Sequence, residues 1–224
     1  MSGITLFTSG STSEPKKVFH SWEYIKQCAL RSAQEIGLTP NDRVLDVFPA
    51  NTIAHYTVTA YPSIISGAHL VSANFNPYSY IELFKEVQPT YISLIPRHLE
   101  LLKSTKGFKD LDMNCVRYMV AGSGKITQEF IDTFRERGVQ IVANWYGMTE
   151  APPPVMIGYN STSFDLSTVP EDYKVTFETV IDSVEPLVEC YINNNPTGDY
   201  FNIETLEFVA RNKSASNKTW KNAF

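Results

Sequence analysis

The chain has 224 residues, of which 43% are hydrophobic and 19% are charged, and this length and composition fit a globular protein with one substantial core. Its formal net charge of −5 gives no basic footprint, so we expect no nucleic-acid partner. The sequence lacks a signal-peptide pattern, lacks an apolar run of the ~20 residues that a membrane-spanning helix needs, and spaces its cysteines without a C-x-x-C pattern, so we expect a cytoplasmic protein with reduced thiols and no membrane partner.

Short apolar runs alternate with amphipathic stretches up to residue 150. The apolar runs predict strands at residues 4–8, 44–48, 69–72, 91–95, 117–121 and 140–143. The amphipathic patterns predict helices at residues 21–36, 54–66, 76–87, 96–103 and 127–137, the first with Ser21 as N-cap and Gly37 as C-terminal stop. Because strands that alternate with helices indicate βαβ units, we predict an α/β fold with a largely parallel sheet flanked by helices.

The pattern changes after Glu150. A run of prolines at residues 152–154 breaks any helix, and residues 164–210 alternate in polarity as antiparallel strands do. We therefore predict three parts: an α/β core of residues 1–158, a small antiparallel β subdomain of residues 159–211 on the C-terminal side, and a polar tail of residues 212–224.

Residues 6–18, LFTSGSTSEPKKV, place hydroxyls, a glycine and two lysines between an apolar strand and the first helix. Hydroxyl and backbone N–H donors can surround phosphate oxygens, lysines supply positive charge, and Gly10 permits close approach of the backbone. The segment therefore suits a polyphosphate, although the same composition also fits a solvated hairpin tip.

Three later segments add to this pattern. NWYGMTE at residues 144–150 follows the apolar run 139–142, TGD stands at residues 197–199, and Arg211 follows the strand-like run 206–210. Ligands of parallel sheets bind beyond the carboxyl ends of the strands. We therefore expect the segment after Phe7 and the segment after Ala143 to lie at that edge.

In their order and separation, these segments resemble the adenylate-forming superfamily of acyl-CoA synthetases, peptide-synthetase adenylation domains and luciferases. The first segment is similar to that family's phosphate loop, T-S-G-[ST]-T-G-x-P-K-G-V, the second to its Y-G-x-T-E segment, and the third to its T-G-D. Further features fall where the family has its P-x-x-H, G-A, P, G-G-A-P and hinge G-R-x-D-D segments: Pro49, Gly67, Ala68, Pro96, residues 121–124 and Arg211.

The resemblance implies an ATP-dependent ligase that activates a carboxylic acid to an acyl-adenylate and releases pyrophosphate, with Mg²⁺ as cofactor. It also implies CoA or another acceptor, engaged with a partner chain. Of the residues it assigns, Lys16, Thr149 and Glu150 are the catalytic set, with Glu150 holding Mg²⁺ directly or through water. It assigns nucleotide contacts to Thr8, Ser9, Gly10, Ser11, Thr12, Lys17, Gly122, Ser123, Gly124, Asn144, Tyr146, Gly147, Asp199 and Arg211.

Each of these roles has a plainer alternative. Tyr146 would stack on adenine or be a core aromatic residue, and Asn144 would read the adenine amino edge or serve a turn. Asp199 would accept the ribose hydroxyls, although Gly-Asp turns are common without function. Glu150 could be a solvated loop carboxylate, and Arg211 could form a surface salt bridge.

Some positions depart from the family pattern. Ser13 and Lys17 replace two glycines of the phosphate loop, and Thr52 stands at the usual histidine of P-x-x-H, which leaves the substrate class open. We interpret the nearby His55 as a satisfied core histidine. The family also has a long region before the phosphate loop and a C-terminal lysine domain. Neither has a counterpart in these residues, so we expect a minimal version of the family.

The sequence leaves one alternative function open and disfavours another. A module that binds ATP, AMP or an acyl-adenylate without turnover would use the same residues. A P-loop nucleotidase is disfavoured because no G-x-x-x-x-G-K-[ST] sequence follows a strand.

Overall fold

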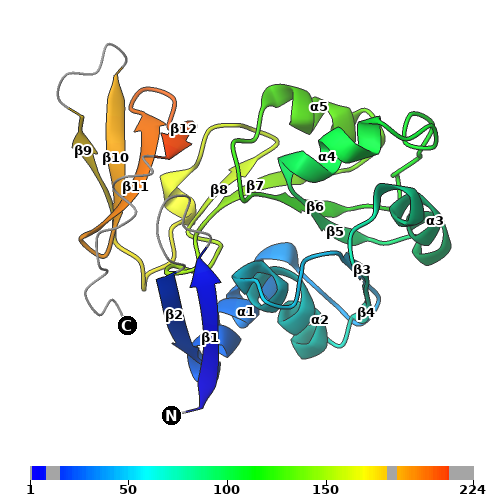
Figure 1. The fold of residues 1–224 in the computed structure, drawn as a ribbon, viewed down its shortest axis with the longest axis horizontal. Coiled ribbons are helices and arrows are strands. Elements are labelled where there is room, and N and C mark those ends of the chain that lie inside the picture. The colour runs from blue at the N-terminus through cyan, green and yellow to red at the C-terminus, as the bar shows by residue number, and fades with distance from the viewer. Residues whose placement is uncertain (1, 9–15, 181–185, 212–224) are drawn as a thin grey trace.

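A computed structural model describes residues 2–8, 16–180 and 186–211 of the chain. Its main sheet has six strands, in the spatial order β4 (His69–Ser72), β3 (Arg43–Asp46), β5 (Tyr91–Leu94), β6 (Tyr118–Ala121), β7 (Val142–Tyr146) and β8 (Met156–Tyr159). All neighbouring strands are parallel except β8, which pairs antiparallel with β7. The predicted α/β fold with a largely parallel sheet is therefore confirmed (Figure 1).

Helices pack on both faces of this sheet. One face carries α3 (Pro77–Val87), α4 (Pro96–Lys103) and α5 (Gln128–Arg135), and the other carries α1 (Trp22–Ile36) and the π-helix η1 (His55–Ala60), with α2 (Tyr61–Ser66) beside them. Neighbouring residues of β3 point to opposite faces of the sheet, since Leu45 packs with the first group of helices and Val44 with the second. This period of two is what a sheet buried on both sides requires.

The ends of α1 follow directly from the sequence. The Ser21 hydroxyl accepts a hydrogen bond from the backbone N–H of Tyr24 at 3.2 Å, as an N-cap does. Gly37 ends the helix with a φ of 63°, in the left-handed region that glycine adopts without strain. Both predicted caps are therefore confirmed.

The predicted single helix over residues 54–66 instead begins as the π-helix η1 and continues as α2. Hydroxyl side chains in this stretch bond back to carbonyl oxygens one turn earlier: Thr57 to Ile53, Thr59 to His55, and Ser63 to Thr59. Such back-bonding competes with the regular helical ladder, which gives a physical reason for the difference.

The position predicted for the phosphate loop was wrong in one respect. The lysines of this segment lie in a second strand, β2 (Lys16–Ser21), which pairs antiparallel with β1 (Gly3–Thr8) and leads into α1. This two-stranded sheet is separate from the six-stranded one, so β1 is not one of its parallel strands. Leu6 and His20 point inward while Phe7 and Phe19 are exposed, which is the alternation of a strand pair covered on one face.

The second part of the chain forms a small antiparallel sheet, as predicted. Its four strands lie in the order β12 (Phe208–Arg211), β11 (Asn195–Asn202), β10 (Leu187–Ile192) and β9 (Val175–Thr179), and the short helix η2 (Leu166–Thr168) precedes them. Asn193 and Asn194, with φ values of 51° and 62°, turn the chain between β10 and β11. The fully buried Phe201 lies in the core of this sheet. The three-part division at residues 158 and 211 stays a prediction.

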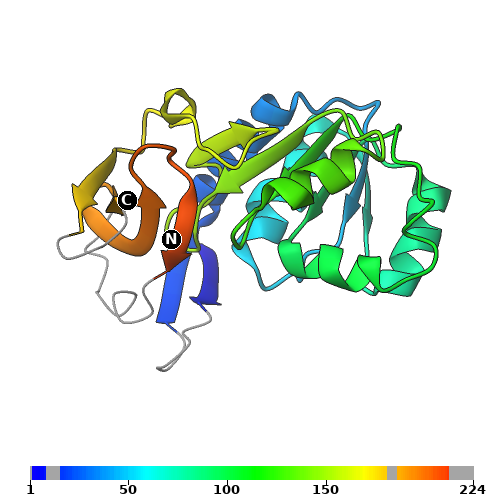
Figure 2. The same cartoon turned by 90° about the horizontal axis from the view of Figure 1, so that it is seen from above.

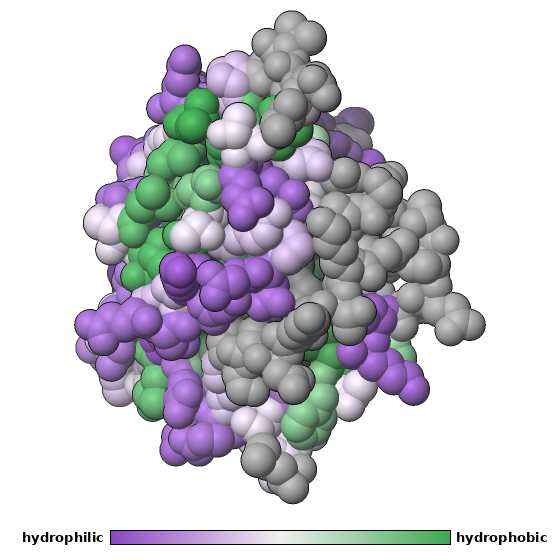
Figure 3. All heavy atoms as spheres, turned by 90° about the vertical axis from the view of Figure 1, so that its left-hand side faces the viewer, coloured by the Kyte–Doolittle hydropathy of each residue, from purple (hydrophilic) through white to green (hydrophobic). Residues whose placement is uncertain are grey.

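The hairpin of β1 and β2 and the four-stranded sheet lie together on one side of the molecule, and the six-stranded sheet with its helices lies on the other (Figures 1 and 2). Seen from the side of the four-stranded sheet, the surface shows hydrophobic patches between larger hydrophilic areas (Figure 3). Within the described residues, no helix combines the length and the apolar character needed to span a membrane.

His98 in α4 makes stability depend on pH. It is 8% exposed, stacks on Phe75 with ring centroids 3.9 Å apart, and burial lowers its pKa from 6.5 to about 4. Below pH 6.5 the unfolded chain therefore binds a proton that the folded chain does not, and stability falls as the pH is lowered towards 4.

We expect His98→Phe, which keeps the stacking, to remove about 1–3 kcal/mol of this acid destabilisation. The measurement is urea unfolding at pH 7 and pH 5, with exposed His69→Asn as the matched control. Equal pH dependence in the wild-type chain and His98→Phe would contradict the assignment.

Candidate nucleotide site

The carboxyl ends of the parallel strands define one edge of the six-stranded sheet. β6 ends at Ala121 and is followed by residues 122–124, and β7 ends at Tyr146 and is followed by residues 147–150. These are the positions that the sequence assigned to a nucleotide, and open α/β sheets bind ligands at this edge.

The hairpin of β1 and β2 reaches the same edge. Lys16 Nζ on β2 lies 3.4 Å from Glu150 Oε1, although 134 positions separate the two residues in the sequence. Two segments predicted to share a site are thus in contact. The side chains are 32% and 11% exposed, respectively, so both remain accessible to a ligand.

His20 supplies a second contact between these segments, which the sequence analysis did not predict. Its Nε2 lies 2.6 Å from the backbone oxygen of Thr149. A carbonyl oxygen only accepts, so Nε2 carries the hydrogen. Burial lowers the pKa of His20 below 6.5. The hydrogen bond to Thr149 and the charge of Glu150 raise this pKa, but their effect is smaller. The neutral ring therefore fixes the Thr149–Glu150 turn against β2.

The residues after β7 form a compact turn. Met148 and Ala151 exchange backbone hydrogen bonds of 2.9 and 3.1 Å. At Gly147, an added Cβ would lie 2.7 Å from Pro153, so only glycine permits this approach. Gly147 therefore has a packing role whether or not a nucleotide touches it.

Asp199 on β11 is the centre of a buried polar cluster. Its side chain has no exposed surface, and it accepts hydrogen bonds from the Tyr146 hydroxyl at 2.8 Å and from Arg211 Nε and Nη2 at 2.5 and 2.7 Å. The hydrogen bonds to Asp199 raise the pKa of Arg211, and burial raises the pKa of Tyr146. The structure thus brings together three residues that were predicted to bind the nucleotide. In this structure their polar groups bind one another.

Asn144 and Tyr146 are both buried in this structure. The Asn144 amide donates to the backbone oxygen of Thr162 at 3.3 Å, and the Tyr146 ring packs edge-to-face on Phe201 with centroids 5.2 Å apart. Each residue thus has a structural partner, and their contacts with adenine stay a prediction.

The loop after β6 is open to solvent. Ser123 has a φ of 57°, and both Ser123 and Gly124 are exposed. An added Cβ at Gly122 would lie 2.8 Å from the Trp145 carbonyl oxygen, so this glycine permits β6 and β7 to approach closely.

The remaining phosphate-loop positions are only partly described. Thr8 ends β1 opposite Lys16, and Lys17 is exposed with Nζ 6.0 Å from the centre of the Phe7 ring. Ser9, Gly10, Ser11, Thr12 and Ser13 lie outside the described residues, as does the predicted tail. Among the residues that are described, no three His, Cys, Asp or Glu side chains form a group that could hold a metal.

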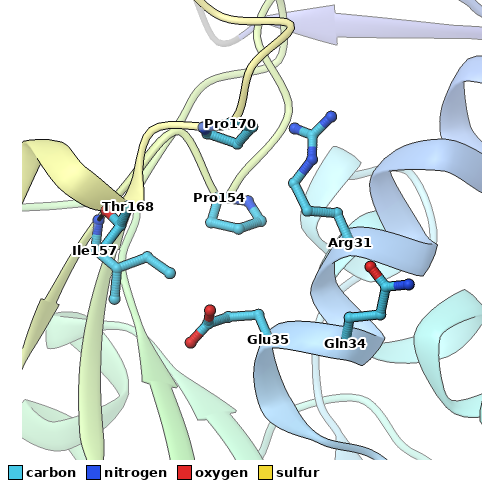
Figure 4. A pocket seen from close by; sticks show the side chains of 7 residues that line it. All are labelled: Arg31, Gln34, Glu35, Pro154, Ile157, Thr168 and Pro170. Atoms are coloured by element: carbon cyan, nitrogen blue, oxygen red, sulfur yellow. Dashed lines mark hydrogen bonds between the residues drawn. The ribbon is translucent and has the colours of Figure 1, made fainter.

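A pocket of about 360 Å³ lies elsewhere, between the C-terminal half of α1 and the segment around η2 (Figure 4). Arg31, Gln34 and Glu35 line one side, and Pro154, Ile157, Thr168 and Pro170 line the other. None of the predicted site residues lines it, so it is distinct from the candidate nucleotide site.

Comparison with known proteins identifies the family. The family model described as AMP-binding enzyme matches residues 4–205. The chain belongs to this family. The match confirms the resemblance inferred from the motifs, and it includes every motif described above except Arg211.

Among curated relatives, the long-chain-fatty-acid–CoA ligase FadD13 of Mycobacterium tuberculosis is 26% identical over 147 residues, covering 65% of this chain and 29% of the relative. This chain therefore matches less than a third of the length of that relative.

Two solved structures share the fold. The inhibitor-bound N-terminal domain of FACL13 from Mycobacterium tuberculosis matches with a TM-score of 0.73 and 20% identity, covering 92% of this chain and 60% of that one. The O-succinylbenzoate–CoA synthetase MenE from Bacillus subtilis, in complex with ATP and magnesium ion, matches with a TM-score of 0.67 and 21% identity, covering 98% and 45%.

His20 should be needed to hold the hairpin at this edge. His20→Ala would leave the Thr149 carbonyl without its partner, and we expect a loss of about 1–3 kcal/mol in the free energy of unfolding. His20→Gln, whose amide can still donate, should lose less. Urea unfolding at pH 7.5 measures both, and equal losses would show that packing rather than the hydrogen bond matters.

Proposed function

We propose that this family member takes part in ATP-dependent activation of a carboxylic acid to an acyl-adenylate. The observation that carries the proposal is the contact between Lys16 and Glu150. It joins the segment suited to phosphate with the segment suited to a metal and the α-phosphate. The reaction requires two anions to meet, so positive charge and fixed geometry are the main demands on the protein.

The lysines of β2 are proposed to meet the outer phosphates. Lys16 is partly exposed next to Glu150, and Lys17 is exposed on the same strand. Both can donate hydrogen bonds to phosphate oxygens and offset their charge. Thr149, held by His20, is proposed to place its hydroxyl at the α-phosphate.

Glu150 is proposed to hold Mg²⁺. A single accessible carboxylate fits this ion, because Mg²⁺ commonly binds one or two carboxylates together with substrate phosphates and waters. When bound, Mg²⁺ would neutralise phosphate charge. Glu150 would then exchange its contact with Lys16 for the metal, which releases the lysine for phosphate.

Asp199, Tyr146 and Arg211 are proposed to recognise the nucleoside. Because Asp199 is fully buried and paired with Arg211, ribose hydroxyls can reach the carboxylate only after Arg211 shifts. Arg211 is the exposed member of the pair, which makes it the side chain able to move.

The substrate is proposed to be a carboxylic acid, with CoA or another acceptor in a second step and a cytoplasmic location. The relative FadD13 is a long-chain-fatty-acid–CoA ligase, which supports an acid and CoA as substrates. The departure at Thr52 leaves the kind of acid open.

The second candidate function is a module that binds adenine nucleotide or acyl-adenylate without turnover. The closed Asp199–Arg211 pair favours it, because the carboxylate proposed for ribose is already paired with an arginine. Pyrophosphate exchange dependent on a carboxylic acid separates the two functions, since only an adenylating enzyme incorporates labelled pyrophosphate into ATP.

We expect ATP and AMP to bind in the presence of Mg²⁺, and GTP to bind more weakly. Asp199→Asn should weaken AMP binding by about 1–3 kcal/mol, the usual cost of losing hydrogen bonds to a charged group. Isothermal calorimetry measures this, with Asp132→Asn on α5 as the control. Absence of heat with both adenine nucleotides at millimolar concentration would refute nucleotide binding.

The loop lysines should matter more for ATP than for AMP. Replacing both Lys16 and Lys17 with Ala should weaken the binding of ATP at least tenfold and that of AMP much less, because only ATP carries the outer phosphates. The exposed Lys85→Ala is the matched control for loss of a charge. Equal losses for ATP and AMP would mean that these lysines do not contact the outer phosphates.

A further inference from the structure

The pocket between α1 and the segment around η2 has one wall that the backbone holds in place. The N–H of Ile157 on β8 donates to the Thr168 hydroxyl at 2.9 Å, and its carbonyl oxygen accepts from the N–H of Asp165 at 2.8 Å. The pocket volume of about 360 Å³ lies within the range that small-molecule sites occupy. The pocket is therefore preformed and large enough for a small ligand.

Glu35 on α1 places an oriented carboxylate in this pocket. Its Oε1 accepts a hydrogen bond from the hydroxyl of Tyr118 on β6 at 3.0 Å and another from the hydroxyl of Tyr159 on β8. Burial raises the pKa of both tyrosines, so both hydroxyls keep their protons and donate. Two donors from two different strands thus fix the position of the carboxylate.

The second oxygen of this carboxylate remains available. Both hydrogen bonds end on Oε1, and within the described part of the chain Oε2 has no hydrogen-bond partner. The Glu35 side chain extends from α1 towards the wall that carries Pro154 and Ile157 (Figure 4). An acceptor oxygen is therefore presented to a ligand in the pocket.

The charges around the pocket favour a cation. Arg31 and Glu35 are the charged residues among those that line it. Arg31 Nη2 lies 2.6 Å from the Asp172 carboxylate, and the guanidinium lies 5.2 Å from the centre of the Tyr173 ring. Its charge is thus already compensated. No Lys, Arg or His side chain of the described residues lies within ion-pair distance of Glu35, so the remaining charge attracts cations and repels anions.

The opposite wall is apolar. Pro154, Ile157 and Pro170 face the side of the pocket formed by α1. Ligand sites commonly combine apolar walls with a few fixed polar groups that determine orientation. An ammonium group can donate a charge-assisted hydrogen bond to a carboxylate, while an attached hydrocarbon body packs against prolines and isoleucine. The pocket offers one partner for each half of such a molecule.

We propose that this pocket binds a small organic cation, a primary ammonium group on an apolar body, with Glu35 as the residue that recognises the charge. The ammonium group donates to Glu35 Oε2, and the apolar body packs against Pro154, Ile157 and Pro170. The site goes beyond the proposed function, because none of these residues belongs to the candidate nucleotide site and binding requires no nucleotide.

The test compares three probes that share an apolar body and differ in charge: 2-phenylethylamine, 2-phenylethanol and 2-phenylethanesulfonate. Each is titrated to millimolar concentration into the uniformly ¹⁵N-labelled chain without ATP, and backbone amide shifts are recorded by NMR at pH 7. The shifts report both the affinity and the location of binding. We expect the amine to shift the amides of Ile157 and Thr168 in a saturable manner, and the alcohol and sulfonate to bind more weakly.

Two variants examine the charges separately. Glu35→Gln keeps an acceptor for the tyrosines but removes the negative charge, and should weaken the amine about 10–100-fold, as expected for loss of a hydrogen bond to a charged group. Glu23→Gln, at an exposed position of the same helix, is the matched control and should leave amine binding unchanged. Arg31→Met should not weaken the amine, because Arg31 is not its partner.

The inference is overturned if the amine leaves the amides of Ile157 and Thr168 unshifted, or if the alcohol binds as tightly as the amine. Tighter binding of the sulfonate, lost in Arg31→Met, would instead identify an anion site. Unchanged affinity in Glu35→Gln would also refute it. Thermal unfolding identifies any variant that fails to fold, and the comparison of the three probes on the wild-type chain then decides.

Discussion

The candidate nucleotide site depends on the contact between the β1–β2 hairpin and the end of β7. A two-stranded sheet is marginal by itself, and this one pairs with no other strand in the described structure. It is held by the packing of Leu6 on Ile25 and Ile53 and by the hydrogen bond of His20 to the Thr149 carbonyl. Lys16 reaches Glu150 only because these contacts orient the strand.

The regular helices and strands could be predicted because each depends on residues that are close together in the sequence. The strands of the main sheet are short apolar runs, and the ends of α1 follow from a serine at the N-cap and a glycine in the left-handed region. The second predicted helix departed from regularity because Thr57, Thr59 and Ser63 bond back to the chain. A run of β-branched and hydroxyl residues signals weak helix formation but does not specify a π-helix.

The family resemblance assigned Tyr146, Asp199 and Arg211 to the nucleotide, and this role stays a prediction. Nothing in their spacing indicated that they would bind one another. The contact of His20 was missed because its partner is a backbone oxygen 129 positions away. Every residue has a backbone carbonyl, so the sequence does not indicate which one would accept this hydrogen bond.

The closed pair of Asp199 and Arg211 has a kinetic consequence. If Asp199 binds ribose as proposed, an opening step must come before or during the encounter, because its side chain has no exposed surface. If opening comes first, the observed rate of nucleotide binding levels off at high ligand concentration at the opening rate, instead of rising without limit. The measured affinity would then fall short of the intrinsic affinity by the open fraction, and under this proposal movement of Arg211 would set both the rate and the affinity of nucleotide binding.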